Sequence, residues 1–297
     1  MEEFRSGYVT IVGRPNVGKS TLTNRIIGEK ITIISDKPQT TRYSINAIYN
    51  DDESQIIFVD TPGIHKPKNK LGEFMLTKAT ETIRDVDIVV MLVDDYDDIG
   101  PGDKFILDAI SKANVPVILV LNKIDTTTPE KYKRIYDMYS EFECIDEIIN
   151  MSALKGINVD LLMKMIKDRL PMGPKYYPDD MITDQPERAI VSEIVREKVL
   201  EYLRDEIPHG VVVEIDKMKY RDGKKKIVDI SATIICEKKS HKGIIIGKGG
   251  RKLKGIGKAA REDIEKFLDY KVFLELWVKV RPGWRDNDSQ LKNYGFK

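Results

Sequence analysis

The chain has 297 residues, of which 41% are hydrophobic and 33% charged, a composition that suits two domains with ordinary cores. Its two cysteines, Cys144 and Cys236, exclude a disulfide framework, and its apolar runs are strand-sized, too short to span a membrane. Residues 181–297 carry 26 Lys+Arg and 19 Asp+Glu, which gives this part a net charge of +7. Because the net charge of the whole chain is +1, residues 1–180 have a net charge of −6. An anionic partner is therefore expected for the C-terminal part.

The first part of the chain alternates apolar runs with amphipathic segments. Strands are expected at 7–12, 44–50, 55–59, 88–93, 117–121 and 148–151. Helices are expected from Gly18 onward and over 69–84, 101–113, 129–142 and 158–169. This alternation predicts an α/β fold with a mostly parallel six-stranded sheet and helices on both faces.

A change of pattern follows at residues 171–186, which hold four prolines and no period, as in a linker. Beyond it we expect a helix, a hairpin, two helices and a strand, an α+β unit of order α-β-β-α-α-β. Their ranges are 187–206, 211–220, 226–236, 240–246, 251–268 and 272–280. The expected domains are 1–172 and 187–297, joined by a linker at 173–186.

Four short motifs each follow an expected strand, and the carboxyl ends of parallel strands meet at one edge of a sheet. The first has the form G-x-x-x-x-G-K-S of a phosphate-binding P-loop. The four motifs together predict a site for GTP or GDP with Mg²⁺. They comprise Gly13, Arg14, Pro15, Asn16, Val17, Gly18, Lys19, Ser20 and the adjacent Thr21; Asp60, Thr61, Pro62, Gly63 and Ile64; Asn122, Lys123 and Asp125; and Ser152, Ala153 and Leu154.

Roles at the phosphates follow from the chemistry of these side chains. The P-loop amides cradle the α- and β-phosphates, and Lys19 reaches the β- and γ-phosphates. Ser20 and Asp60 are expected to hold Mg²⁺. A threonine of the segment 37–42 completes the Mg²⁺ shell, with Thr41 preferred and Thr40 as the alternative. The residues expected to act in catalysis are Lys19, Thr41, Asn16 and Gly63, whose amide senses the γ-phosphate.

The third and fourth motifs select the base. The Asp125 carboxylate accepts hydrogen bonds from guanine N1–H and the N2 amino group, whereas adenine lacks that amino group and presents an acceptor at N1. Asn122 and Lys123 buttress and cover the base, and the Ala153 amide is expected to meet guanine O6.

Two features point to unusual hydrolysis. Ile64 stands where the best-known small GTPases place the glutamine that orients water, so intrinsic hydrolysis is expected to be slow, or to depend on something else. The Asn16 amide oxygen is expected to bind K⁺ beside the phosphates, where positive charge stabilises the transition state. The alternative is that Asn16 only caps the loop.

The second strong signal is a G-x-x-G between two helices, Gly247 to Gly250, the KH arrangement that clamps single-stranded RNA. A lone G-x-x-G is usually only a turn and a basic run only a solvated face, but here both coincide within the α-β-β-α-α-β order. Residues 238–261 include nine Lys/Arg and no acidic residue. RNA is therefore expected, and DNA is not. The predicted RNA-binding residues are Ile244, Ile245, Ile246, Gly247, Lys248, Gly249, Gly250, Arg251, Lys252, Lys254 and Lys258.

With these motifs in order, together with Pro38-Gln39-Thr40-Thr41-Arg42 and Val280-Arg281-Pro282-Gly283-Trp284, the chain resembles the Era family of GTPases, a TrmE-Era-type G domain followed by a type II KH domain. The resemblance covers nearly the whole length. It implies binding to the single-stranded 3′ end of small-subunit (16S) ribosomal RNA and a role in maturation of the small (30S) ribosomal subunit from its precursor. It also implies peripheral association with the cytoplasmic membrane.

The resulting hypothesis is a monomeric, cytoplasmic, GTP-switched RNA-binding protein. No cationic, apolar leader opens the sequence. One alternative is a GTP-binding scaffold in which Ile64 makes hydrolysis negligible. Another is a membrane-surface GTPase whose basic module binds anionic lipid. The sequence leaves open whether the tail after Trp284 packs on the module or touches RNA.

Overall fold

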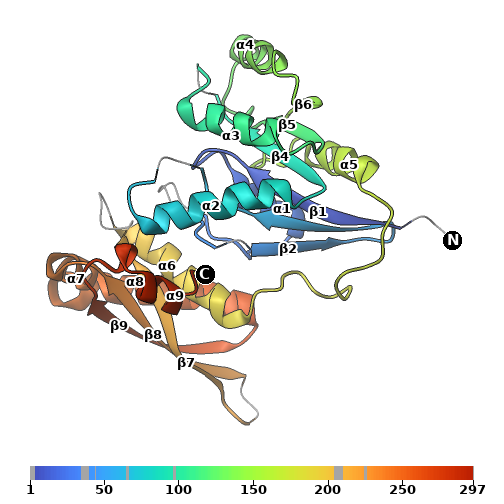
Figure 1. The fold of residues 1–297 in the computed structure, drawn as a ribbon. Coiled ribbons are helices and arrows are strands. Elements are labelled where there is room, and N and C mark those ends of the chain that lie inside the picture. The colour runs from blue at the N-terminus through green and yellow to red at the C-terminus, as the bar shows by residue number, and fades with distance from the viewer. Residues whose placement is uncertain are drawn as a thin grey trace. The chain divides into compact units, whose positions relative to one another are not determined.

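The computed structural model describes residues 4–34, 40–43, 45–64, 67–95, 98–203, 210–223 and 226–296. The chain divides into two compact units, and the boundary along the sequence lies between Asp184 and Gln185. Figure 1 shows an α/β unit followed by a smaller α+β unit. Each is described by itself.

The first unit is built on a six-stranded sheet of order β2-β3-β1-β4-β5-β6. Only β2 runs antiparallel to its neighbour, while the other four pairings are parallel. The strands are β1 (Arg5–Val12), β2 (Ile45–Asn50), β3 (Ser54–Asp60), β4 (Ile88–Val93), β5 (Val117–Leu121) and β6 (Glu147–Asn150). This confirms the predicted mostly parallel α/β sheet.

Helices cover both faces of this sheet, as Figure 1 shows. They are α1 (Lys19–Ile27), α2 (Lys70–Arg84), α3 (Pro101–Ser111), α4 (Pro129–Ser140) and α5 (Val159–Arg169). Strand β4 explains the arrangement, because all six of its side chains are buried. Ile88, Val90 and Leu92 join one apolar cluster, and Val89, Met91 and Val93 join another. A strand buried on both faces has a continuous apolar sequence, which is the pattern found here.

The segment expected to be a linker is partly attached to the first unit. Ile48 N–H in β2 donates to Ile182 O at 2.9 Å, and Ser6 N–H donates to Pro171 O at 3.1 Å. Gln55 accepts from the amides of Tyr176 and Tyr177 through its side-chain oxygen. Residues 171–184 thus lie along the sheet without forming a helix or strand. Their proline-rich sequence has no hydrophobic period, so this attachment to the sheet could not be predicted from it.

The second unit has the predicted order α-β-β-α-α-β. Its elements are α6 (Glu187–Tyr202), β7 (Val212–Tyr220), β8 (Ile227–Cys236), α7 (Lys239–Ile246), α8 (Arg251–Leu268) and β9 (Lys271–Val280). The sheet order is β7-β8-β9, with β7 antiparallel and β9 parallel to β8. The helix predicted over 187–206 ends at Tyr202, and residues 204–206 lie outside the described part.

The residues after β9 are packed onto this unit. Trp284 is fully buried, its Nε1–H donates to Gly210 O at 3.0 Å, and its ring contacts those of Tyr294 and Phe296. A short helix, α9 (Asp288–Asn293), lies between these aromatic residues in the chain. Three aromatic side chains therefore anchor a tail whose role the sequence left open.

Candidate functional site

The P-loop joins the end of β1 to the start of α1. Gly13 and Gly18 adopt φ values of 152° and 106°. A Cβ at Gly13 would lie 2.4 Å from Leu92 O, and one at Gly18 would lie 2.3 Å from Asn122 Nδ2. Any side chain at Gly13 would therefore displace the backbone of β4, and any side chain at Gly18 would displace the base-recognition loop, residues 122–125. These glycines let the loop wrap closely at the carboxyl edge of the sheet.

Lys19 lies beneath this loop. Its Nζ donates to the carbonyl oxygens of Gly13 at 3.0 Å and Arg14 at 2.8 Å. Burial lowers the pKa of Lys19 to about 8, although the nearby Asp60 opposes this effect. The ammonium group is therefore held in place while its charge is poorly compensated, an arrangement that suits anionic phosphate oxygens.

Oxygen atoms from three distant segments meet beside Lys19. Ser20 Oγ lies 3.1 Å from Thr41 Oγ1, and it donates to Asp60 Oδ2 at 3.4 Å. Within the described part of the chain, Asp60 Oδ1 is buried and has no hydrogen-bond partner. Burial raises the pKa of Asp60 to about 6, against the opposing effects of Lys19 and Ser20. Hydroxyl and carboxylate oxygens with an unsatisfied acceptor among them fit Mg²⁺, a hard cation with oxygen ligands.

The structure thus brings Thr41 to Ser20, and Thr41 is the predicted first choice. Thr40 is half-buried beside it, while Lys37, Pro38 and Gln39 of the same predicted segment lie outside the described residues. Thr41 is itself buried at 8% exposure. The loop that carries it therefore reaches the site from a position about twenty residues beyond the P-loop.

The motif after β3 combines structural and site residues. Thr61 is fully buried, and its hydroxyl donates to Ile11 O at 3.1 Å, which joins the ends of β1 and β3. A Cβ at Gly63 would lie 3.1 Å from Pro15 N and 3.3 Å from Lys19 Nζ, so Gly63 lies against the P-loop. Ile64, by contrast, is buried in the apolar cluster of the first unit. Its side chain therefore belongs to the core.

The base-recognition loops form a hollow of about 210 Å³ next to the P-loop. Asn122 Nδ2 donates to Val17 O at 2.7 Å, and the Ser152 hydroxyl donates to Asp125 Oδ1 at 2.6 Å. These bonds orient the carboxylate expected to read guanine. The hollow is lined by Asn16, Gly18, Thr21, Asn122, Lys123, Asp125, Thr126, Ser152, Ala153 and Leu154.

Two further details concern residues of the predicted site. The Ala153 amide donates to Asn122 Oδ1 at 2.9 Å, so in this structure it braces the asparagine. Val17 is buried at 1% exposure, and its side chain belongs to the core. Asn16, in contrast, is exposed on the hollow with φ 69°, a left-handed conformation that asparagine tolerates.

Sequence reasoning missed Asp94 and Asp103, two carboxylates that hold these loops through the predicted residues Arg14 and Lys123. Arg14 contacts Asp94 at 3.1 Å and the fully buried Asp103 at 3.0 Å. Asp94 also pairs with Lys123 of the base-recognition loop at 3.0 Å. The available signal was position, since Asp94 directly follows β4 at the same edge of the sheet.

A second brace that the sequence did not reveal comes from α1. Arg25 donates through Nε to Ala153 O at 2.5 Å and through its terminal nitrogen to Leu154 O at 2.6 Å. Gly156 lies against the same guanidinium group. The helix that follows the P-loop therefore also fixes the loop on the far side of the base.

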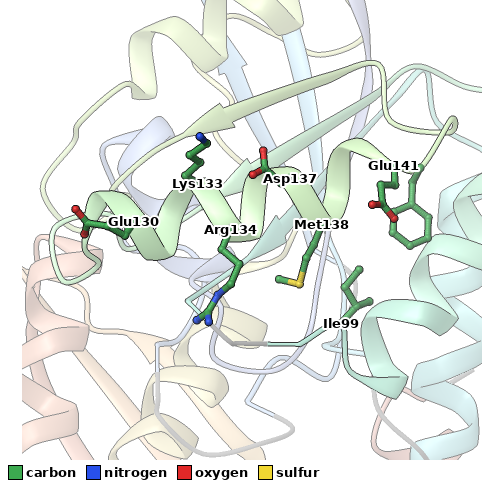
Figure 2. Close-up of a pocket in the computed structure, with 8 residues that line it drawn as sticks. Ile99, Glu130, Lys133, Arg134, Asp137, Met138 and Glu141 are labelled. Carbon is green, nitrogen blue, oxygen red and sulfur yellow. The ribbon is translucent and has the colours of Figure 1, made fainter.

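Hollow size alone does not identify the site. A hollow of about 530 Å³ lies along α4 and is larger than the nucleotide hollow. Figure 2 shows Met138 of α4 pointing toward Ile99, with Glu130, Lys133 and Asp137 along the same helix. None of its lining residues belongs to a motif, so the convergent polar groups, and not the volume, locate the nucleotide site.

The G-x-x-G of the second unit forms one 3₁₀ turn, Lys248–Gly250, between α7 and α8. Gly249 and Gly250 have φ values of 59° and 74°, and open space surrounds the position of a Cβ at either. A Cβ at Gly247 would lie 2.7 Å from Lys252 Cβ. Gly249 and Gly250 of the predicted clamp thus allow a close approach from solvent.

The remaining predicted RNA-binding residues divide by exposure. Lys248, Arg251, Lys254 and Lys258 are exposed, whereas Lys252 is half-buried. Ile244 is 42% exposed, but Ile245 is fully buried in the core of the unit. Ile245 was therefore wrongly predicted to line the surface, because on a helix adjacent residues face different directions. Ile246 is half-buried.

Within the described residues, no helix has the length and apolar character needed to cross a membrane. Over the same ranges, no group of three or more His, Cys, Asp or Glu side chains could hold a metal ion. The site at Ser20, Thr41 and Asp60 is different in kind, since two of its three side chains contribute hydroxyl groups.

The fold and the two sites define a P-loop GTPase domain joined to a KH domain. Family models agree, since "50S ribosome-binding GTPase" matches residues 8–123 and "KH domain" matches residues 206–285. GTPase Era of Alkaliphilus oremlandii is 60% identical, and that of Clostridioides difficile is 58% identical, each over 99% of both chains. The chain belongs to the GTPase Era family, which confirms the resemblance seen in its motifs.

Two solved structures are similar over 99% of both chains, each with a TM-score of 0.94. One is a single-residue variant of Aquifex aeolicus Era bound to GDP·AlF₄⁻, at 41% identity. The other is Era in complex with MgGDPNP and nucleotides 1506–1542 of 16S ribosomal RNA, at 42% identity.

Proposed function

We propose that this protein is a GTP-hydrolysing switch that binds the 3′ end of small-subunit ribosomal RNA and assists maturation of the small subunit. The observation that carries the nucleotide part is the meeting of Lys19, Ser20, Thr41 and Asp60 beside the glycines of the P-loop. The oriented Asp125 carboxylate favours guanine over adenine. GTP or GDP with Mg²⁺ is the ligand that this set of groups fits.

Hydrolysis in this site is attack of water on the γ-phosphate. Lys19 stabilises charge on the phosphate oxygens, and Mg²⁺ bound by Ser20, Thr41 and Asp60 would supply further positive charge there. The Ile64 side chain has no hydrogen-bonding group and is buried, so it cannot orient water, and we infer a slow intrinsic rate. K⁺ at the exposed Asn16 is the additional charge that we propose would speed the reaction.

RNA binding is assigned to the G-x-x-G turn and its exposed cations. Support comes from the open approach to Gly249 and Gly250 and from the Era complex that contains 16S ribosomal RNA. We further propose that GTP orders the loop around Thr41 and thereby permits RNA binding, and that hydrolysis releases the subunit precursor.

The proposed setting is the cytoplasm, with peripheral association at the cytoplasmic membrane and a monomeric state. Both cysteines are free thiols, Cys144 half-buried and Cys236 buried, which suits a reducing compartment. Membrane association would use the same basic surface as RNA. Vesicle sedimentation with anionic lipid, with and without competing RNA, tests whether the two compete.

The first experiment measures RNA affinity with GDP and with a non-hydrolysable GTP analogue. The ligands are an RNA of the 16S 3′ end and a scrambled RNA of the same composition. Tighter, sequence-selective binding in the GTP form is expected. Absence of binding to the 3′-end RNA in either state would rule out the proposed RNA function.

A GTP-binding scaffold with negligible hydrolysis is the second candidate, and the buried Ile64 is the observation that favours it. Multiple-turnover phosphate release in K⁺ and in Na⁺, with and without the RNA, separates the two. We expect slow turnover that increases with K⁺. Less than one phosphate released per protein under all conditions would establish the scaffold.

A further inference from the structure

Strand β9 presents two large aromatic side chains to solvent. Trp277 is 63% exposed and Phe273 is 53% exposed, the former among the most exposed large apolar side chains described. The strand alternates, because Val272 and Val278 face the core of the second unit while Phe273 and Trp277 face the opposite side. The outer face of the sheet β7-β8-β9 therefore carries an aromatic surface that the core does not use.

This aromatic surface adjoins the predicted RNA groove. β9 is an edge strand of its sheet. A Cβ at Gly257, in the helix that follows the G-x-x-G turn, would lie 3.4 Å from Leu276 Cδ1. Leu276 thus faces α8, and its neighbour Trp277 projects from the other face of the same strand. An RNA strand that passes from α8 around the edge of β9 would reach the face that carries Trp277.

The residues that pair with the two aromatic residues on β8 are too small to cover their rings. Thr233 pairs with Trp277 and Asp229 with Phe273 across β8 and β9, and both are small. Asp229 is neutralised by Arg221, whose guanidinium group also lies 5.9 Å from the Phe273 ring centroid. A sheet face with accessible rings and a guanidinium group near one of them suits nucleobases.

Charge on this face is balanced, since the basic side chains of Lys217, Lys219, Arg221 and Lys279 accompany the carboxylates of Glu214, Asp216, Asp229 and Glu275. Lys217, Lys219 and Lys279 are exposed and form no ion pair among the described residues. Glu214 and Glu275 are the corresponding carboxylates, while Asp216 accepts a hydrogen bond from the Thr233 hydroxyl at 2.8 Å. Lys279 follows Trp277 on β9, whereas Lys217 and Lys219 lie on β7, level with Glu275 and Phe273, so an RNA strand that crosses the sheet from β9 to β7 would meet a cation on each of these strands.

We propose that Trp277 and Phe273 form a second RNA contact, on which unpaired bases stack after the RNA leaves the G-x-x-G groove around the edge of β9. The inference rests on the proposed RNA-binding function. Four residues of strand separate the two rings, about 13 Å at 3.3 Å per residue, a span of a few nucleotides. A KH groove clamps about four nucleotides, whereas the RNA in the similar Era complex comprises nucleotides 1506–1542 and is therefore longer than such a groove.

The test compares three RNAs from the 16S 3′ end in the presence of a GTP analogue. One is a six-nucleotide RNA that fills the groove, and the others extend it by six nucleotides on the 5′ or the 3′ side. Trp277→Ala should lower affinity for at least one extended RNA by about 5- to 100-fold, as expected for loss of base stacking. Affinity for the six-nucleotide RNA should stay the same, and Trp277→Phe should restore much of the loss.

Intrinsic fluorescence gives an independent readout, because the chain has two tryptophans and Trp284 is fully buried. The extended RNA should quench the exposed Trp277, and the six-nucleotide RNA should not. Tyr136→Ala, at a 40% exposed aromatic of α4 in the other unit, is the control and should change no RNA affinity.

The outcomes separate this inference from the proposed function. If the native chain binds none of the RNAs, the proposed function fails. If Trp277→Ala binds all three like the native chain and RNA does not quench Trp277, the second contact is overturned. Quenching by small-subunit proteins stripped of RNA, without quenching by RNA, would show that this face binds protein and would also overturn it.

Discussion

The Asp94 carboxylate and the Lys123 ammonium group form an ion pair with 3.0 Å between Oδ2 and Nζ. The other oxygen of Asp94 contacts Arg14 at 3.1 Å. Asp94 is 6% exposed, so both pairs are shielded from water and from salt on one side. One carboxylate therefore connects the P-loop, through Arg14, with the base-recognition loop, through Lys123.

Asp94→Asn should weaken guanine-nucleotide binding by about 10- to 100-fold, since loss of a charge-assisted hydrogen bond typically removes about 1.5–3 kcal/mol. GDP and the GTP analogue should be affected alike, because neither loop contacts the γ-phosphate through Asp94. Titration with a fluorescent nucleotide measures this. Asp95→Asn is the matched control, because Asp95 is 37% exposed and pairs with Lys131 on the surface. Equal effects of the two changes would contradict a connecting role for Asp94.

Asp125→Asn should exchange base specificity. The carboxylate accepts hydrogen bonds from guanine. The asparagine amide that takes its place can instead donate a hydrogen bond to the C2 carbonyl of xanthine. The Ser152 hydroxyl can still bond the new side-chain oxygen, which keeps the group oriented. Affinity for GDP should fall at least about 100-fold, and affinity for xanthosine diphosphate should rise. Competition titration with both nucleotides measures the change, and retained GDP preference would show that Asp125 does not read the base.

Asp60→Asn should stabilise the nucleotide-free protein while weakening Mg²⁺-dependent binding of GTP. Burial raises the pKa of Asp60 from 3.8 to about 6, which corresponds to about 3 kcal/mol at most against the charged form. A raised carboxyl pKa makes folding most favourable below about pH 4, and that stability is lost as the pH rises through about 6. The gap in unfolding free energy between variant and native chain should therefore widen from about pH 4 to 6 and then remain constant. A gap independent of pH would contradict this.

Gly249→Asp should weaken RNA binding by more than about tenfold and leave GTP hydrolysis without RNA unchanged. The carboxylate would point into the open space where phosphates are expected, and repulsion adds to the strain of a side chain at φ 59°. Gly223→Asp is the control, because Gly223 also has a positive φ and open surroundings but lies in the β7–β8 turn. Filter binding at two salt concentrations measures both variants. Similar losses in both would indicate general damage to the unit.

Trp284→Ala should lower the stability of the second unit by about 3–5 kcal/mol, the usual loss for a fully buried tryptophan. Trp284→Phe keeps the ring packing against Tyr294 and Phe296 but removes the bond to Gly210 O, so about 1–3 kcal/mol should be lost. Calorimetry with saturating GDP should show the second unit unfolding earlier while the first is unaffected. An unchanged profile for the alanine variant would mean that the tail does not stabilise the unit.

Much of the nucleotide site was predictable because the residue types of short segments determine their backbone conformation. Gly13 and Gly18 signal positive φ, and apolar runs of strand length signal a parallel sheet. The carboxyl ends of such strands necessarily share one edge, so the motifs that follow them had to converge. The α-β-β-α-α-β order and the G-x-x-G turn could also be predicted, because they too depend on the residue pattern of short segments. The same motifs indicated membership of the family.

Other features were decided only by packing in three dimensions. Asp94, Arg14 and Lys123 are far apart in the sequence, and no local pattern reveals that they pair. The same holds for Arg25, which braces the loop at Ala153.

The sequence by itself determined which ligand the first unit suits and which module follows it, because glycine conformation and side-chain periodicity are properties of short segments. Tertiary structure decided that Ile245 and Ile64 are core residues and that Trp277 is exposed while Trp284 is buried. Those distinctions depend on which surfaces the assembled elements cover, and burial is a property of the whole fold and not of the segment.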